Sequence, residues 1–295
     1  MFAIIDYMKK GWLVRNSFIH NPKFDNLFEM LLKTFKSRDI DLEVKEASDL
    51  GLEVNVLKGN FKPDFVLFWD KDIYLARKLE MMGIRLFNSS SAVFLCDNKI
   101  VMYQELAKEG IRIPKTYIAP KTYENLGYSS FDFLDEIIKE IGFPFVIKEA
   151  YGSFGKQVYL ANNIEEAKEI ITKIWWKPFL IQEFIASSKG KDVRINVVGD
   201  KVIASMYREN NNDFRSNISN GGNGSRFEPN NEFKQLAIKA AKVIGCDFAG
   251  VDVLFGPNNE PIICELNSNP QFASTLEATG IDLGEFIADY ILERI

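Results

Sequence analysis

Apolar positions in the first third of the chain form two alternating kinds of segment. Some are short apolar runs of strand length, and others repeat every three or four residues as an amphipathic helix does. The expected strands are residues 1–5, 40–44, 65–69 and 84–87, and the expected helices are residues 26–38 and 73–82. Strands that alternate with helices are typical of a parallel α/β layer. We therefore predict a small parallel α/β domain over residues 1–93.

The rest of the chain changes to pairs of strands joined by turns, with amphipathic helices between the pairs. The expected strands are residues 114–119, 142–148, 157–160, 179–185, 191–198, 201–207, 248–255 and 261–267. The expected helices are residues 96–108, 131–141, 164–174, 233–244 and 282–294, and residues 268–279 are expected to form a loop. This pattern predicts a mixed α+β region, which we divide into residues 94–185 and 186–295.

The hairpin expected over residues 248–267 carries the most specific candidate chemistry. If it closes around Asn258 and Asn259, Asp252 faces Glu265 with Cβ atoms ~5 Å apart. The strand period of two places Asn267 on the same face. Opposed carboxylates destabilise a sheet unless a cation lies between them, and three oxygen ligands suit Mg²⁺. The alternative is a pair of solvated carboxylates at a sheet edge.

A second candidate is the turn Gly152–Gly155, which joins two expected strands. It matches neither the dinucleotide-binding nor the Walker A pattern, because no helix follows it directly. Its backbone N–H groups could still cover phosphates as a flap, although an ordinary tight hairpin would also explain the glycines. Lys148 ends the preceding apolar strand, where its charge needs a partner. Lys99 begins a helix, which is unfavourable for a cation unless an anion is bound there; a solvated lysine is the alternative.

The strand expected at residues 191–198 alternates strictly, so that Asp192, Arg194 and Asn196 share one face. An acid beside residues able to hold phosphate suits a nucleotide site, and a solvated sheet face is the alternative. The long loop over residues 213–225 is rich in glycine and asparagine, and loops of this length are often functional.

Composition excludes several classes of protein. Hydrophobic content of 46% with 26% charged residues is typical of a globular chain, and the net charge of −5 disfavours nucleic-acid binding. The three cysteines are far apart in sequence, which argues against disulfides or a zinc site, and His20 is the single histidine. No apolar run approaches the ~18 residues of a membrane span. Residues 1–5 are too short for a signal-peptide core, so we expect a cytoplasmic location.

Eight short segments, in this order and spacing, resemble the ATP-grasp superfamily and look most like the RimK-type carboxylate–amine (alpha-L-glutamate) ligases. These segments are residues 97–99, 146–148, 152–155, 182–185, 192–194, 213–217, 249–252 and 265–267. The similarity covers roughly residues 88–295. It implies an α/β (α+β) protein with an ATP-grasp fold, preceded by a small parallel pre-ATP-grasp domain.

The resemblance also implies three groups of site residues. Those expected to bind ATP are Lys99, Lys148, Gly152, Ser153, Gly155, Gln182, Glu183, Phe184, Ile185, Asp192 and Asn217. Those expected to hold Mg²⁺, or Mn²⁺, are Asp252, Glu265 and Asn267. Those expected to act in catalysis, by stabilising the transferred phosphoryl group, are Arg194 and Arg215.

Within the ATP-binding group, the resemblance assigns the α- and β-phosphates to Lys99 and Lys148. The glycine turn would close over them. Glu183 and the backbone through Ile185 would bind the adenine, and Asp192 would bind the ribose.

The implied reaction has two steps. A substrate carboxylate attacks the γ-phosphate to give an acylphosphate, and an amine then displaces phosphate to form an amide. Such a site needs mainly charge neutralisation and positioning, which fits a chain with one histidine. The expected partners are amino-acid and carboxylate substrates, with glutamate or another amino acid added to a peptide, protein or small-molecule acid.

Three other interpretations stay open. One is a ligase that modifies ribosomal peptides, such as a macrocyclase; another is a non-catalytic ATP-binding regulatory protein; the third is an α/β binding domain without nucleotide. Relatives in this family are often dimers or tetramers, but the sequence does not decide between a monomer and a homo-oligomer. Many RimK-type sequences have Pro-Gly soon after the segment matching 265–267, whereas this chain has Ser268–Phe272. We therefore expect Gln271 and Phe272 to shape the substrate pocket.

Overall fold

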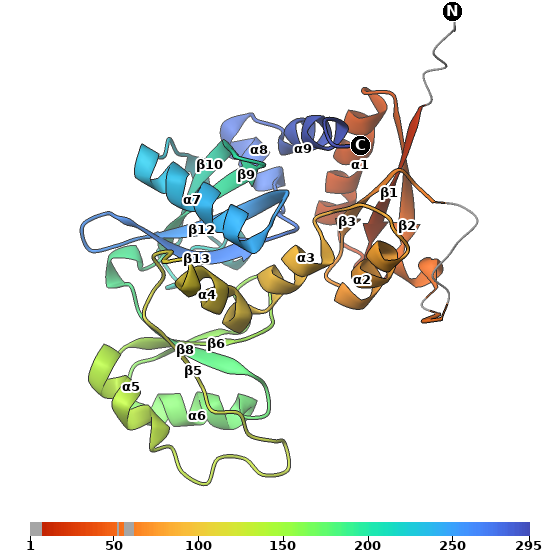
Figure 1. The fold of residues 1–295 in the computed structure, drawn as a ribbon. Helices are drawn as coiled ribbons and strands as arrows, with labels where there is room; N and C mark the ends of the chain where they lie inside the picture. The colour runs from red at the N-terminus through yellow and green to blue at the C-terminus, as the bar shows by residue number, and fades with distance from the viewer. Residues whose placement is uncertain (1–7, 52, 56–61) are drawn as a thin grey trace, which may run out of the picture.

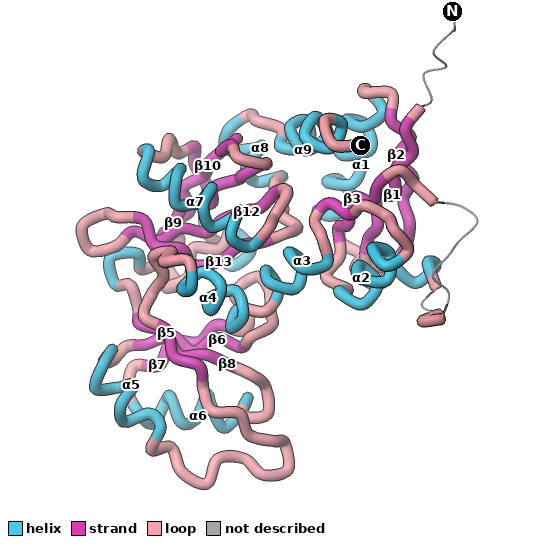
Figure 2. The backbone as a smooth tube through the Cα atoms, viewed as in Figure 1, coloured by secondary structure: helices cyan, strands magenta, loops and turns pink. Residues whose placement is uncertain are grey.

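A computed structural model describes residues 8–51, 53–55 and 62–295, which form three sheets with helices packed against them (Figure 1). The tube view separates the same three groups of strands (Figure 2). The predicted class, an α/β protein of mixed parallel and antiparallel sheets, is confirmed. Within the described residues, no helix is both long enough and apolar enough to cross a membrane.

The N-terminal sheet is parallel, in the order β2-β1-β3-β4. Its elements are β1 (Lys9–Arg15), α1 (Pro22–Lys36), β2 (Ile40–Glu46), β3 (Phe65–Trp69), α2 (Ile73–Met81) and β4 (Leu86–Phe87). The strand predicted at residues 1–5 lies outside the described residues. We did not predict β1, because its apolar run is only Trp12–Val14 and follows two lysines and a glycine.

The second sheet is antiparallel, in the order β5-β8-β6-β7, and α5 and α6 cover one of its faces (Figure 1). Its elements are β5 (Thr116–Ile118), α5 (Phe133–Ile141), β6 (Phe145–Glu149), β7 (Val158–Ala161), α6 (Ile164–Ile174) and β8 (Phe179–Glu183). We call this unit the lid. Its apolar core is built from residues between Tyr117 and Ile181.

The third sheet, in the order β11-β10-β9-β12-β13, is antiparallel and packs against α4 and α7. Its elements are α4 (Lys99–Lys108), β9 (Lys191–Val198), β10 (Lys201–Glu209), β11 (Asn223–Arg226), α7 (Asn231–Ile244), β12 (Phe248–Phe255) and β13 (Pro261–Asn267). The remaining helices are α3 (Ser90–Asp97), α8 (Ala273–Thr279) and α9 (Leu283–Leu292).

The N-terminal domain and the third sheet share one hydrophobic core. The Trp69 ring, at the end of β3, stacks on the Phe248 ring of β12 with centroids 5.5 Å apart. Helix α9 packs against α1 and contributes buried residues to the same cluster. The division at residues 93/94 and 185/186 stays a prediction.

One predicted loop is wrong: residues 268–279 include α8, a helix of seven residues. It contains few apolar residues, so no helical period stood out in the sequence. Gly280 ends it in the left-handed conformation, where its N–H reaches the Leu276 carbonyl at 2.7 Å. Helix α3 and strand β11 were also not predicted.

Candidate active site

Two open cavities share part of their lining, one with about 770 Å³ of empty space and the other with about 870 Å³. We call them the first and the second cavity. The expected site residues that line only the first are Lys99, Lys148, Gly155, Gln182, Glu183, Phe184, Ile185, Asp192 and Arg215. Those that line only the second are Ser153, Arg194 and Asn267. Asn217, Asp252 and Glu265 line both, so the cavities meet at these side chains.

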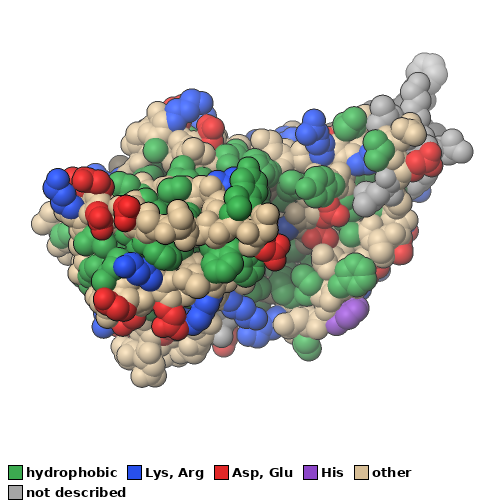
Figure 3. Space-filling view, turned by 90° about the horizontal axis from the view of Figure 1, so that it is seen from below, with side chains coloured by type: hydrophobic (Ala, Val, Ile, Leu, Met, Phe, Trp, Pro, Cys, Tyr) green, Lys and Arg blue, Asp and Glu red, His purple; other side chains and the backbone are tan. Residues whose placement is uncertain are grey.

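The second cavity lies between the N-terminal domain and the third sheet, because its lining includes Trp69 and Asp70 from one side and Asn267 and Asn269 from the other. In the space-filling view, charged and hydrophobic side chains surround the hollow between the N-terminal domain and the rest of the chain (Figure 3). Of the expected residues, Gly152 alone lines neither cavity, but its carbonyl accepts a hydrogen bond from Lys99 Nζ at 3.0 Å.

The predicted pairing of Asp252 with Glu265 across the β12–β13 hairpin is confirmed. The turn itself is shifted, because Gly256 N–H bonds the Glu260 carbonyl and the register changes by one residue after Asp252. Cys264 is the extra residue of this bulge. The bulge offsets the shifted turn, so the two carboxylates still face each other.

Each of these opposed carboxylates has its own cation. Asp252 is buried with 4% of its surface exposed; its Oδ2 accepts from Arg194 Nη2 at 3.0 Å, and its Oδ1 lies 2.9 Å from Arg208 Nη2. Burial alone would raise the pKa of Asp252, but the two guanidinium groups outweigh it and lower that pKa. Glu265 Oε1 lies 3.3 Å from Lys99 Nζ. The chain thus compensates both charges without a metal.

The donor atoms nevertheless suit a hard cation. Two carboxylates and an amide oxygen are ligands of the kind that Mg²⁺ accepts, with phosphates and water completing its shell. Asn267 Nδ2 makes a long contact, 3.5 Å, with the Gly250 carbonyl. Across the described chain, no group of three or more His, Cys, Asp or Glu could hold a metal, so Asn267 would have to be the third protein ligand.

Lys148 is a buried cation, and no carboxylate in the described part of the chain pairs with it. It is 7% exposed, and its Nζ donates to Tyr103 Oη at 3.2 Å and approaches Cys264 Sγ at 3.8 Å. Tyr103 donates in turn to the Cys264 carbonyl, and burial raises the pKa of Tyr103 to about 12. Among the described residues, no carboxylate forms an ion pair with Lys148. An uncompensated buried ammonium is costly, so this site favours a bound anion.

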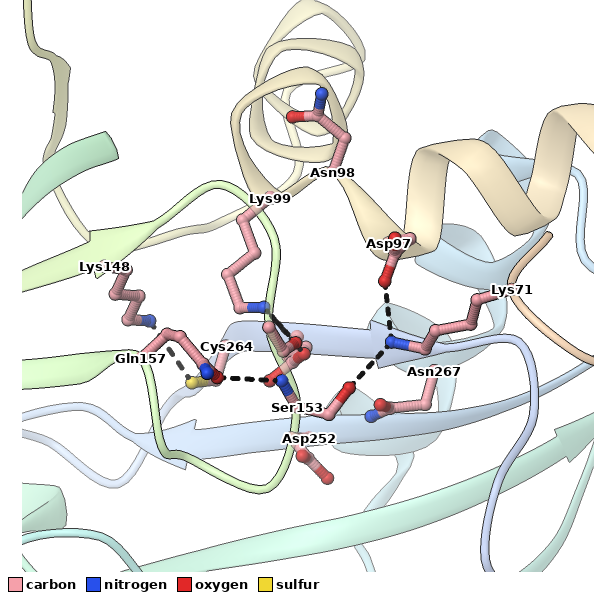
Figure 4. A network of polar contacts seen from close by, with 12 residues as sticks. Lys71, Asp97, Asn98, Lys99, Lys148, Ser153, Gln157, Asp252, Cys264 and Asn267 are labelled. Carbon is pink, nitrogen blue, oxygen red and sulfur yellow. Dashed lines mark hydrogen bonds and ion pairs between the residues drawn. The ribbon is translucent and has the colours of Figure 1, made fainter. Parts of the chain in front are cut away.

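Lys99 and Lys148 extend from different elements toward the strands that carry Asp252 and Cys264 (Figure 4). Asn98 caps helix α4 by accepting from Ile100 N–H at 3.2 Å and Val101 N–H at 3.3 Å. Lys99 follows this cap, where the helix dipole is also positive. The two lysine side chains therefore make one side of the first cavity attractive to phosphate.

The glycine turn lies against the 213–220 loop. Arg215 Nη1 donates to the Gly155 carbonyl. Gly155 has a φ of +69°, and a Cβ there would lie 3.0 Å from Asn217 Oδ1 and 3.2 Å from Arg215 Cδ. Arg215 also binds Asp213 and lowers the pKa of that carboxyl. The turn and the loop therefore pack together as one flap at the edge of the first cavity.

The segment expected to bind adenine borders the first cavity beside Val146, Val158 and Leu254. Strand β8 ends at Glu183, two residues earlier than predicted, so Phe184 and Ile185 leave the sheet. Glu183 Oε1 accepts from the Lys115 N–H at 2.6 Å, and Gln182 Nε2 donates to Thr116 Oγ1 at 2.7 Å.

Asp192 is buried, and both of its carboxylate oxygens bind Arg208. The sequence placed Asp192 on a polar strand face but did not predict this ion pair. Asp192 Oδ1 and Oδ2 accept from Arg208 Nε and Nη2 at 2.7 and 2.5 Å. A role in ribose binding would therefore require this ion pair to share its oxygens with the ligand.

Sequence reasoning missed several site residues, namely Lys71, Tyr103, Arg208 and Cys264. Lys71 Nζ donates to Asp97 Oδ1 at 2.7 Å and to Ser153 Oγ at 2.9 Å, which links the N-terminal domain to the glycine turn (Figure 4). The one sequence feature that could have identified Arg208 is its charge directly after the apolar strand expected at residues 201–207.

The expectation for Phe272 is wrong. Its side chain is fully buried and packs edge-on against Trp69 at 6.2 Å, because the chain enters α8 there and turns the ring into the shared core. Gln271 does line the second cavity, as expected.

Comparison with known proteins agrees with this geometry. Residues 96–291 match the RimK-like ATP-grasp domain. The chain is 35% identical to human N-acetylaspartylglutamate synthase A over 83% of its own length and 64% of that protein. It is 37% identical to a probable alpha-L-glutamate ligase of Maridesulfovibrio salexigens over 74% of this chain and 70% of the relative.

Solved structures share the fold at low identity. D-cycloserine synthetase superposes with a TM-score of 0.75 at 14% identity, covering 97% of this chain and 99% of the other. An ATP-grasp RimK domain protein from Sphaerobacter thermophilus gives 0.72 at 19% identity, covering 96% and 98%. These matches confirm the predicted ATP-grasp fold, and with the matched domain they show that the chain belongs to the RimK-like ATP-grasp family of ligases.

Proposed function

We propose that this enzyme is an ATP- and Mg²⁺-dependent carboxylate–amine ligase that forms an amide through an acylphosphate. The observation that carries the proposal is the meeting of the two cavities at Asn217, Asp252 and Glu265. One cavity has the cations and apolar walls that a nucleotide needs. The other opens toward the N-terminal domain and has room for the substrates. A phosphoryl group passing from ATP to an acid would cross where they join.

The residues of the first cavity bind and orient ATP. Lys99 and Lys148 hold its phosphates. The flap, which is the Gly152–Gly155 turn (with Ser153) packed on the 213–220 loop, excludes water from them. Asp252, Glu265 and Asn267 would hold Mg²⁺, which neutralises charge on the β- and γ-phosphates when bound.

Arg194 and Arg215 stabilise the charge on the phosphoryl group during transfer. Arg194 is bound to Asp252 before ATP arrives. Because Arg208 also pairs with Asp252, Arg194 can turn to the phosphoryl group without leaving that carboxylate uncompensated. The substrate carboxylate attacks the γ-phosphorus, the bond to the β–γ bridging oxygen breaks, and ADP leaves. The amine then attacks the acyl carbon of the acylphosphate, and phosphate leaves.

The names of two relatives guide the choice of substrates, since they are synthases of N-acetylaspartylglutamate and beta-citrylglutamate. The purified protein is incubated with Mg-ATP, an acid (N-acetyl-L-aspartate, citrate or a Glu-containing peptide) and an amine (L-glutamate or another amino acid). We expect ADP and an amide only when both acid and amine are present. Binding of Mg-ATP without ADP across this panel would instead support the regulatory interpretation.

A further inference from the structure

Three residues that line the second cavity each have an unpartnered polar atom. The atoms are Trp69 Nε1, Asp70 Oδ2 and Asn269 Oδ1, each buried and without a hydrogen-bond partner. Six side-chain atoms have this property in the described chain, and three of the six belong to residues that line this cavity. Buried polar groups are normally paired, and unpaired ones of this kind indicate a missing ligand or water.

Asp70 and Asn269 are held in place by their other atoms. Asp70 Oδ1 accepts from Lys71 N–H at 2.6 Å and Asn16 Nδ2 at 3.3 Å, which leaves Oδ2 free. Asn269 Nδ2 donates to the Asp70 carbonyl at 2.8 Å, which leaves Oδ1 free. Asp70 follows the end of a parallel strand, where α/β sheets usually bind ligands.

Both free oxygens are hydrogen-bond acceptors, and Asp70 can also supply a negative charge. Burial raises the pKa of Asp70, which reflects the cost of a charged carboxylate without a cation. Lys71 is not that cation, because its ammonium binds Asp97 and Ser153. A group with several N–H donors and a positive charge would satisfy both oxygens, and an ammonium is such a group.

The second cavity therefore has two chemically different ends. Asp252 and Glu265, which would hold the metal, lie at the end shared with the first cavity, and Arg194 binds Asp252 there. Asp70, from the N-terminal domain, and Asn269, from the segment after β13, lie together elsewhere in the lining, joined by the hydrogen bond from Asn269 Nδ2 to the Asp70 carbonyl. A substrate carboxylate would be repelled by Asp70 and attracted to the Arg194 end, which leaves Asp70 and Asn269 for the amine.

We propose that Asp70 and Asn269 bind the amine substrate of the second step as its ammonium. One ammonium proton passes to Asp70, and the free amine then attacks the acyl carbon of the acylphosphate, whose bond to the phosphate oxygen breaks as phosphate leaves. The proposal rests on the proposed ligase function. It assigns the N-terminal domain the task of selecting a primary amine, and the third sheet the task of holding the acid.

The test separates the two half-reactions. Hydroxylamine is small enough to trap the acylphosphate as a hydroxamate without being held by Asp70 and Asn269. In Asp70→Asn, we expect hydroxamate formation from the acid and Mg-ATP to stay within about twofold of the wild type. The KM for the amine, L-glutamate or whichever amino acid supports most ADP formation, should rise at least about tenfold, since a charge-assisted hydrogen bond is lost. Asp70→Glu, which keeps the charge, should restore part of this loss.

Two controls keep the result specific. Asp41→Asn, on the exposed face of β2, should change neither the rate of hydroxamate formation nor the KM for the amine. The thermal stability of Asp70→Asn should not fall, because asparagine keeps the acceptor for Lys71 N–H and removes a buried charge.

An unchanged amine KM in Asp70→Asn, or an equal loss of hydroxamate formation and amine use, would overturn the proposal while leaving the ligase function standing. If the wild-type protein forms neither hydroxamate nor ADP with any acid of the panel, the ligase function itself fails, and this proposal fails with it.

Discussion

Arg208 Nη2 lies 2.9 Å from Asp252 Oδ1, although the two residues belong to strands that are not neighbours. Strand β9 runs between β10 and β12, and its Asp192 binds the same guanidinium. One buried arginine thus compensates two buried carboxylates, one of them a candidate metal ligand.

Replacing Arg208 by methionine should cost about 3–5 kcal/mol of unfolding free energy, because two buried carboxylates lose a partner. Urea unfolding measures this. Arg226→Met, on the exposed edge strand β11, serves as the control and should stay within about 0.5 kcal/mol of the wild type. A similar small change for Arg208→Met would contradict the role given to its ion pairs.

The pH dependence of stability should report on Asp252. Its pKa is lowered in the folded protein, so its contribution to stability is present above the usual aspartate pKa of about 3.9 and is lost as the pH falls through the lower folded value. The difference in unfolding free energy between the wild type and Asp252→Asn should therefore shrink as the pH is taken from 5 toward 2. A constant difference over this range would argue against the charge as its source.

Glu265→Gln offers the cleaner test of the metal site, because Glu265 is only partly buried and, among the described residues, its one ion pair is with Lys99. We expect the Mg²⁺ concentration that gives half-maximal ADP formation to rise by about tenfold or more, since a charged oxygen ligand is lost. Thermal unfolding without ligands should change little. The same Mg²⁺ dependence in variant and wild type would remove Glu265 from the metal site.

Lys148→Met should make the ligand-free protein at least as stable as the wild type, because it removes a buried ammonium without an ion pair. It should also remove most of the stabilisation by Mg-ATP. That stabilisation is about 2.7 kcal/mol for the wild type at a ligand concentration of 100 Kd. Thermal melts with and without Mg-ATP measure both effects, and a full ATP shift in the variant would contradict phosphate binding by Lys148.

Gly155→Ala should raise the KM for ATP, because a Cβ would push the glycine turn away from Asn217 and Arg215. Gly110→Ala is a matched control, since Gly110 has a similar φ of +65° but a Cβ there would meet no atom within 4 Å. Both variants should lose about 1–2 kcal/mol to backbone strain, and steady-state kinetics should separate them. Equal KM values for ATP would show that the flap contact is unimportant.

Sequence patterns predicted the framework of the site but not its buried ion pairs. The opposition of Asp252 and Glu265 followed from strand periodicity and a short turn, which are local properties. The pairing of Arg208 with Asp192 depends on a bulge at Ile203 in β10. Without this extra residue, a regular hairpin that turned at Gly199 and Asp200 would have placed Tyr207 opposite Asp192. A single inserted residue of this kind leaves no clear trace in the hydrophobic pattern.

The sequence pattern also did not predict contacts between residues that are distant along the chain. Tyr103 looked like one more apolar residue of a helix, and its contact with Lys148 joins residues 45 apart in sequence. Phe272 was placed in the substrate pocket because it follows the metal-site segment, yet the helix that starts after it directs the ring into the core. A residue that follows a strand closely in sequence does not necessarily point its side chain toward the site that the strand carries.

The stacking of Trp69 on Phe248 has a consequence for motion in the catalytic cycle. It joins the N-terminal domain and the third sheet through one continuous core, which also includes α9, so these two parts behave as a single rigid body. The lid has a largely separate core. We therefore expect opening and closing to be a motion of the lid, and we expect the distance between Asp70 and Asp252 to stay the same in the open and closed states.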